Sequence, residues 1–161
     1  MAESQESVVC IIHSPLSGTV CSLDEVRDPA FSKRMIGDGV AVIPEGMDVI
    51  APVSGKVVSV FETKHAVVFE NAADVRVLLH IGIDSMRLQG EGFSSHVANG
   101  QQVQKGEKLL SLDLDYLKAH VREMMSPVVI TESRQRFGIR VVAAGHVEIG
   151  DPLYEVYELG G

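Results

Sequence analysis

The stretch that decides the fold is TKHAVVFENAADVRVLLHIGID, residues 63–84. Two runs rich in valine and leucine flank the polar segment NAAD, a pattern that predicts a β-hairpin with a four-residue loop. In that hairpin Glu70 pairs with Val75, and further along the same ladder His65 lies directly opposite His80. Directly opposed residues share one face of a sheet, with Cβ atoms about 4.5–5.5 Å apart. The hairpin therefore predicts two imidazole rings side by side.

Short runs of valine and isoleucine recur along the rest of the chain, separated by turn-forming sequences such as SPLSG, PEG, APVSG and KGE. Runs of β-branched residues with this punctuation are typical of antiparallel sheets. Long helices do not alternate with the strands, which argues against a doubly wound parallel sheet. The predicted fold class is all-β, an antiparallel β-sandwich or barrel.

One short helix is expected near residues 114–125. Asp113 is a suitable N-cap, and Pro127 prevents the helix from continuing. The apolar residues at helical spacing are Leu114, Leu117, Val121, Met124 and Met125. This face is expected to pack on the sandwich.

The composition is that of an ordinary globular domain, with 161 residues of which 45% are hydrophobic and 22% charged. We expect residues 1–7 to be disordered and residues 8–159 to form a single domain. A net charge of −8 argues against nucleic acid or an anionic membrane surface as the main partner.

The chain shows no sign of export or membrane insertion. No apolar run approaches the ~20 residues of a membrane-spanning helix, and the polar start lacks the features of a signal peptide. Cys10 and Cys21 do not form a CxxC motif. We expect a cytoplasmic protein with both thiols reduced.

Two facing imidazoles suit phosphoryl chemistry, because one ring nitrogen can accept a phosphoryl group while the second ring donates a hydrogen bond to its oxygens. Thr63 is expected on the same strand face as His65, where its hydroxyl could fix that ring. Gly82 would allow a partner backbone to come close to His80. The residues alone leave two other interpretations open: ordinary sheet histidines, or a zinc site with Asp84 as a third ligand.

An ordered set of short motifs covers nearly the whole chain, roughly residues 7–159. The motifs are SPLSG (14–18), GDG (37–39), APVSG (51–55), TKHA (63–66), LLHIGID (78–84), GEGF (90–93) and SPVVIT (126–131). Together they resemble the glucose-type enzyme IIA component of the bacterial phosphoenolpyruvate-dependent sugar phosphotransferase system. The resemblance implies a sandwich with jelly-roll and Greek-key connections.

The resemblance also implies roles for individual residues. His80 would be phosphorylated on its Nε2 atom, His65 would contact the phosphoryl group, and Thr63 would support His65. Asp84 would have a neighbouring electrostatic role, with Gly82 beside it. No cofactor is implied. An apolar docking surface would include or adjoin Phe31, Met35, Ile36, Val40, Phe61, Leu78 and Met86.

The implied partners are the histidine-containing phosphocarrier protein, as donor, and a sugar permease with IIB and IIC domains, as acceptor. Members of the family also bind transporters and enzymes according to their phosphorylation state. Although no metal is required, His65 and His80 could bind zinc together with a partner. The chain has Ile81 where the family usually has phenylalanine, which bears on partner choice rather than on chemistry.

Two other classes share part of the pattern. Zinc endopeptidases of the barrel type have an H-x-x-x-D spacing like that from His80 to Asp84, but they also need a later H-x-H pair, which this sequence lacks. Biotinyl and lipoyl carrier domains have strands like VIAPVSGKVVSV. Their modified lysine usually lies between methionines, and Lys64 in TKHA is a poor match.

Overall fold

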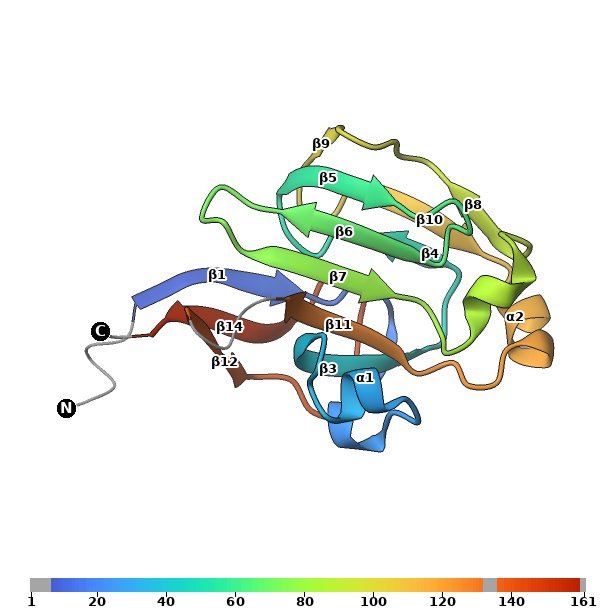
Figure 1. Ribbon diagram of the computed structural model, residues 1–161, viewed down its shortest axis with the longest axis horizontal. Helices are drawn as coiled ribbons and strands as arrows, with labels where there is room; N and C mark the ends of the chain where they lie inside the picture. The colour runs from blue at the N-terminus through green and yellow to red at the C-terminus, as the bar shows by residue number, and fades with distance from the viewer. Residues whose placement is uncertain (1–6, 132–135, 160–161) are drawn as a thin grey trace.

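The computed structural model describes residues 7–131 and 136–159. Within these residues most of the regular structure is antiparallel β-sheet, which confirms the predicted all-β sandwich (Figure 1). The largest sheet has the strand order β13-β2-β3-β11-β7-β6-β5-β9. Its strands are β2 (Gly18–Ser22), β3 (Gly37–Pro44), β5 (Gly55–Val60), β6 (Ala66–Glu70), β7 (Arg76–His80), β9 (Gln102–Val103), β11 (Ser126–Thr131) and β13 (His146–Val147).

Two smaller sheets, with the orders β1-β14-β12 and β4-β10-β8, complete the sandwich. Their strands are β1 (Ser7–His13), β4 (Asp48–Ile50), β8 (Phe93–Ser95), β10 (Lys108–Leu112), β12 (Phe137–Val141) and β14 (Pro152–Glu158). Ser7, expected to be disordered, is already part of β1 and pairs with Glu158. The rest of the predicted disordered segment, 1–6, lies outside the described residues.

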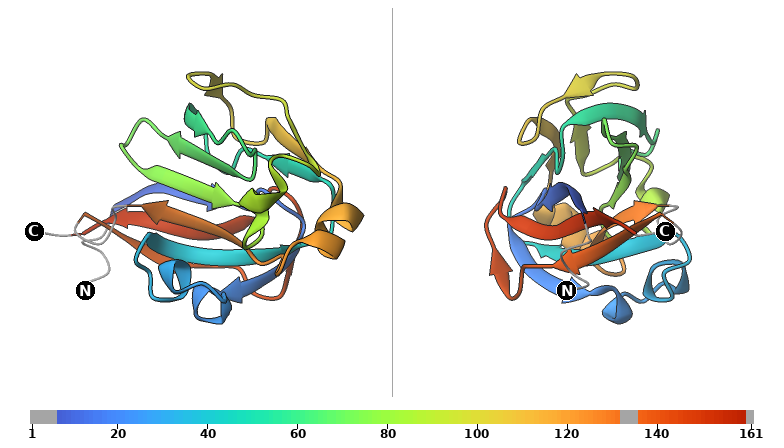
Figure 2. Two further views of the ribbon diagram at one scale, coloured as in Figure 1. Left: turned by 45° about the vertical axis from the view of Figure 1, so that its right-hand side comes forward. Right: turned by 90° about the vertical axis from the view of Figure 1, so that its left-hand side faces the viewer.

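The helical segments are short and lie at the edges of the sandwich. They are η2 (Leu23–Glu25), α1 (Pro29–Ser32), η3 (Ser85–Leu88) and α2 (Leu114–His120). In Figures 1 and 2, α2 lies at one end of the molecule and α1 lies against the outside, near β3. The sequence of α1 explains its position: Asp28 caps it by accepting a hydrogen bond from the Ala30 N–H, and Pro29 occupies its first turn.

Alternation along the strands divides the apolar side chains between two clusters. The main core lies inside the sandwich, draws on all three sheets and includes Val67, Val77 and Leu79. A second cluster lies on the other face of the largest sheet and includes Phe31, Ala66, Leu78, Ile83 and Val129. Because η2 and α1 contribute Leu23 and Phe31, these short helices cover that outer face. His80 belongs to the outer face, since it pairs with Ala66.

The hairpin register differs by one residue from the prediction. Glu70 pairs with Arg76 rather than with Val75, so that five residues separate the two strands. The reason is an Asx turn: the Asn71 side-chain oxygen accepts hydrogen bonds from the N–H groups of Ala73 and Val75. His80 therefore faces Ala66, and the prediction that His65 lies directly opposite His80 is wrong.

Helix α2 begins as expected and ends early. The Asp113 side chain accepts a hydrogen bond from the Tyr116 N–H, but the last helical residue is His120. Val121 is extended, with φ −94° and ψ 154°. The next residues instead form a bridge in which the Ile83 N–H donates to the Glu123 carbonyl. Pairing with the segment after β7 outweighs helical continuation to residue 125.

Candidate functional site

Two histidine rings meet on the outer face of the largest sheet, where β7 ends. The ring centroids of His65 and His80 are 4.8 Å apart and the rings are nearly perpendicular, at 83°. His80 is the last residue of β7, whereas His65 lies just before β6 and is therefore free of the strand's alternation. The preceding residue, Lys64, has a positive φ of 59°. This turn lets the rings meet despite the shifted register.

His80 is oriented by a backbone carbonyl. Its Nδ1 atom lies 2.8 Å from the Gly82 oxygen. A carbonyl oxygen only accepts hydrogen bonds, so Nδ1 must carry the hydrogen. In the neutral ring the lone pair then lies on Nε2, at the far side of the imidazole. The half-buried ring is thus held in the tautomer whose lone pair is on Nε2.

His65 is almost fully buried and is oriented by a hydroxyl group. Its Nδ1 atom lies 2.6 Å from Thr63 Oγ1. Thr63 belongs to the turn before β6, not to a strand face as predicted, and its contact with the ring is made within that turn. Burial, and to a smaller extent the neighbouring His80, lowers the pKa of His65 from 6.5 to about 4. The ring is therefore neutral near pH 7.

Aromatic side chains flank both rings. Phe31 from α1 packs edge-on against His80, with centroids 5.2 Å apart, and Phe61 packs edge-on against His65 at 5.4 Å. Burial in these surroundings lowers the pKa of His80, whereas the hydrogen bond to Gly82 and the carboxylate of Asp28 act in the opposite direction. Both imidazoles are accordingly favoured in their neutral form, as a nitrogen nucleophile requires.

The residues expected at the docking surface fall into two groups. Met35, Ile36, Phe61 and Met86 are exposed, whereas Phe31, Val40 and Leu78 are buried. Phe31 and Leu78 belong to the outer cluster beneath the histidines, and Val40 belongs to the main core inside the sandwich. The four exposed residues are accessible to a docked protein, whereas Phe31 and Leu78 adjoin the histidines from beneath and Val40 lies in the core.

Gly82 and Asp84 follow His80 closely in the sequence, and the structure shows the contacts that each of them makes. Gly82 is buried and has φ +72°, and a side chain there would lie 3.3 Å from the Glu123 oxygen. Its carbonyl group, rather than open space for a partner, is what serves His80. Asp84 is exposed and forms an ion pair with Arg122 at 3.6 Å. The carboxylate that acts on His80 is that of Asp28, which the Asp-Pro signature of a helix start could have indicated.

Metal ligands do not gather around the pair. Within residues 7–131 and 136–159, no group of three or more histidine, cysteine or acidic side chains is arranged to hold a metal ion. The two imidazoles would supply only two of the four ligands that a tetrahedral zinc site needs. Asp84, considered from the sequence as a third ligand, is engaged with Arg122.

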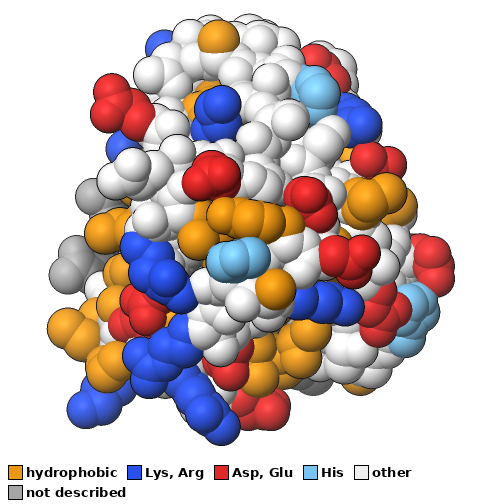
Figure 3. Space-filling model, turned by 90° about the vertical axis from the view of Figure 1, so that its right-hand side faces the viewer, with side chains coloured by type: hydrophobic (Ala, Val, Ile, Leu, Met, Phe, Trp, Pro, Cys, Tyr) orange, Lys and Arg blue, Asp and Glu red, His pale blue; other side chains and the backbone are white. Residues whose placement is uncertain are grey.

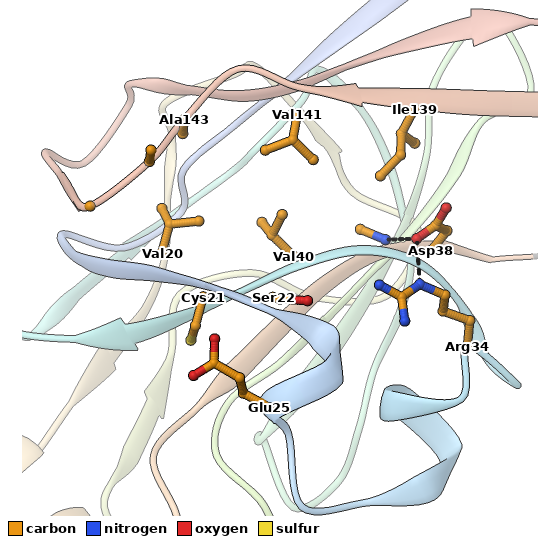
Figure 4. A pocket seen from close by; sticks show the side chains of 13 residues that line it. Val20, Cys21, Ser22, Glu25, Arg34, Asp38, Val40, Ile139, Val141 and Ala143 are labelled. Carbon is orange, nitrogen blue, oxygen red and sulfur yellow. Dashed lines mark hydrogen bonds and ion pairs between the residues drawn. The ribbon is translucent and has the colours of Figure 1, made fainter.

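A separate pocket of about 370 Å³ lies between strands β2 and β3 on one side and β12 with the segment that follows it on the other (Figure 4). Val20 and Val40 face Ile139 and Val141 across it, and none of its lining residues is a histidine. Its basic group is already engaged: Arg34 Nε lies 3.2 Å from the Asp38 carboxylate, which also accepts from the Gly39 N–H.

Comparison with known proteins identifies the family of the chain. The model of the family described as "phosphoenolpyruvate-dependent sugar phosphotransferase system, EIIA 1" matches residues 10–137. The chain belongs to this family. A solved structure, glucose permease IIA from Mycoplasma capricolum, is 39% identical and superposes with a TM-score of 0.86. The match covers 91% of this chain and 94% of that one.

Family membership gives this EIIA chain a phosphocarrier role in the sugar phosphotransferase system. It also confirms the resemblance found from the ordered motifs, since the matched range contains both histidines. None of the helices in the described part of the chain has the length and apolar character needed to span a membrane.

The low pKa of His65 predicts a pH dependence of stability. Above pH 6.5 the ring is neutral in both states and contributes nothing. As the pH falls from 6.5 to about 4, the ring takes up a proton in the unfolded chain but not in the folded one, and stability is lost by about 3 kcal/mol. Urea unfolding across this range should show a flatter dependence for His65→Gln than for the wild type. If the free energy of unfolding of the two proteins changed equally with pH, the low pKa of His65 would be contradicted.

Proposed function

We propose that this EIIA chain carries its phosphoryl group on Nε2 of His80. The observation that carries the proposal is the hydrogen bond from His80 Nδ1 to the Gly82 carbonyl, which leaves the lone pair on Nε2 next to a second imidazole. The Nε2 lone pair attacks phosphorus in the phosphohistidine of the donor, the histidine-containing phosphocarrier protein. A new N–P bond forms, the donor's N–P bond breaks, and its electron pair returns to the donor ring.

His65 then stabilises the transferred group. When the Thr63 hydroxyl donates to His65 Nδ1, the hydrogen of the neutral ring lies on Nε2, where it can be donated to a phosphoryl oxygen. Such a donor is most effective at a site shielded from water, where the charge of about −1.5 to −2 on the group is poorly solvated. The nearly complete burial of His65 favours this role.

A docked partner would supply the remaining shielding. Phe61 is exposed and touches His65. Three further apolar side chains are exposed: Met35 and Ile36 in the turn that follows α1, and Met86 in η3. Covering apolar surface on docking excludes water from the transfer site. Figure 3 shows the end of the molecule where α2 lies. On this face hydrophobic side chains are exposed between acidic and basic ones.

The second half-reaction passes the phosphoryl group to a cysteine thiolate of a permease IIB domain, releasing His80 with its lone pair restored. The net charge of −8 favours a donor with basic residues around its own histidine. We also propose a cytoplasmic location, where the free thiols of Cys10 and Cys21 remain reduced. Residues 8–159 would act as one domain, because one hydrophobic cluster draws on all three sheets.

Labelling with radioactive phosphoenolpyruvate, in a mixture that contains the donor protein and its kinase, tests the assignment. His80→Gln should abolish incorporation of phosphate, because the attacking atom is lost. His65→Gln should still incorporate phosphate but transfer it to IIB about 100-fold more slowly, because one donor to the phosphoryl oxygens is missing. Continued labelling of the His80→Gln protein would refute the proposal.

The docking surface is tested by the kinetics of phosphorylation by the donor. Phe61→Ser should raise the KM for the donor protein about tenfold with little change in kcat, because it removes exposed apolar contact area. Val8→Ser is the matched control, since Val8 is similarly exposed but lies on β1, away from the end of β7 (Figure 1). Equal KM values for the two variants would place the docking surface elsewhere.

A further inference from the structure

Buried hydroxyl groups gather beside the candidate phosphoryl acceptor. In the described ranges four polar residues are classed as buried: Ser14, His65, Ser85 and Ser126. Ser85 and Ser126 are fully inaccessible to solvent and therefore cannot touch a docked protein. Burying a hydroxyl group away from water costs free energy unless the group is hydrogen-bonded. The partners of these two serines show what they do.

The two serines hold opposite edges of one peptide group, the one between Ile81 and Gly82. Ser85 Oγ donates to the Ile81 carbonyl at 2.5 Å, and Ser126 Oγ accepts from the Gly82 N–H at 3.0 Å. The Ser126 hydroxyl hydrogen is itself directed to the Met124 carbonyl at 2.8 Å, which leaves an oxygen lone pair for Gly82. This peptide plane is thereby fixed from both sides.

The next peptide group, between Gly82 and Ile83, is held in the same way. The Ile83 N–H donates to the Glu123 carbonyl at 2.8 Å, and the Gly82 carbonyl accepts from His80 Nδ1. Gly82 has φ +72°, a conformation that glycine adopts readily and that permits several alternative orientations of the following carbonyl. The neighbouring hydrogen bonds therefore decide where that carbonyl points.

We propose that Ser126, assisted by Ser85, is a positioning residue that keeps the Gly82 carbonyl on His80 Nδ1 and so makes Nε2 the attacking atom. This inference rests on the proposed phosphorylation of His80. Without the Ser126 oxygen, the Gly82 N–H loses its acceptor in a buried place, and the peptide can turn to find another. The hydrogen on His80 is then free to move to Nε2, which removes the nucleophilic lone pair from the side that faces His65.

The proposed role leaves a signature separate from stability. Nitrogen-15 NMR of His80 reports which ring nitrogen carries the hydrogen, and the kinetics of phosphorylation by the donor protein separate kcat from KM. In Ser126→Ala the tautomer with hydrogen on Nε2 should become populated, and kcat should fall about tenfold, the loss expected for one hydrogen bond. The KM should not change, because Ser126 is not exposed.

Two controls accompany this variant. Ser126→Thr retains the hydroxyl in a strand position and should keep both the wild-type tautomer and kcat. Ser14→Ala removes another fully buried hydroxyl, which donates to the Leu16 carbonyl in the β1–β2 connection, and should leave His80 unaffected. Ser85→Ala gives an independent second test, because it releases the opposite edge of the same peptide and should shift the tautomer in the same direction.

This inference would be overturned if both Ser126→Ala and Ser85→Ala kept the wild-type His80 tautomer and the wild-type kcat. If His80 is labelled in the wild-type protein, that result would leave the proposed function intact. Absence of label on His80 in the wild-type protein would overturn both. Equal loss of kcat in Ser14→Ala and Ser126→Ala, with no change of tautomer in either, would also overturn it, since the effect would then be general destabilisation.

Discussion

The hydrogen bond between His80 Nδ1 and the Gly82 carbonyl is the interaction on which the site depends. It requires the chain to turn within two residues of the end of β7, and glycine with a positive φ makes this turn possible. It also decides which ring nitrogen carries the hydrogen, because Nδ1 must donate to the carbonyl and Nε2 then keeps its lone pair. Under the proposed function, this single backbone contact selects the ring nitrogen that reacts.

The surrounding fold supplies what this contact alone cannot. Strand β6 brings His65 beside His80, α1 covers the outer face of the sheet with Phe31, and the segment after α2 contributes the Glu123 carbonyl and Ser126. These elements are far apart in the sequence, and they converge because antiparallel pairing places the ends of β6, β7 and β11 together. The same burial that positions the rings keeps them neutral, since desolvation disfavours the charged imidazolium.

Local pattern predicted the all-β fold and the meeting of the two histidines, but not the details that tertiary contacts decide. The Asn71 side chain lengthened the hairpin loop by one residue, and the rings still met because His65 lies outside the strand. The apolar residues at helical spacing continue to Met125, but α2 ends at His120 because Glu123 pairs with Ile83. Burial of an apolar residue such as Val40 and the partner of a serine such as Ser126 depend on packing between distant segments, which one sequence does not reveal.

The most direct test of this account is the nitrogen-15 NMR spectrum of His80 in the unmodified and phosphorylated wild-type protein at neutral pH. We predict that the resting ring carries its hydrogen on Nδ1 and that the phosphorylated ring shows coupling to phosphorus at Nε2. A resting ring with its hydrogen on Nε2, or phosphorus bonded to Nδ1, would contradict it, because the Gly82 contact would then not select the reacting atom.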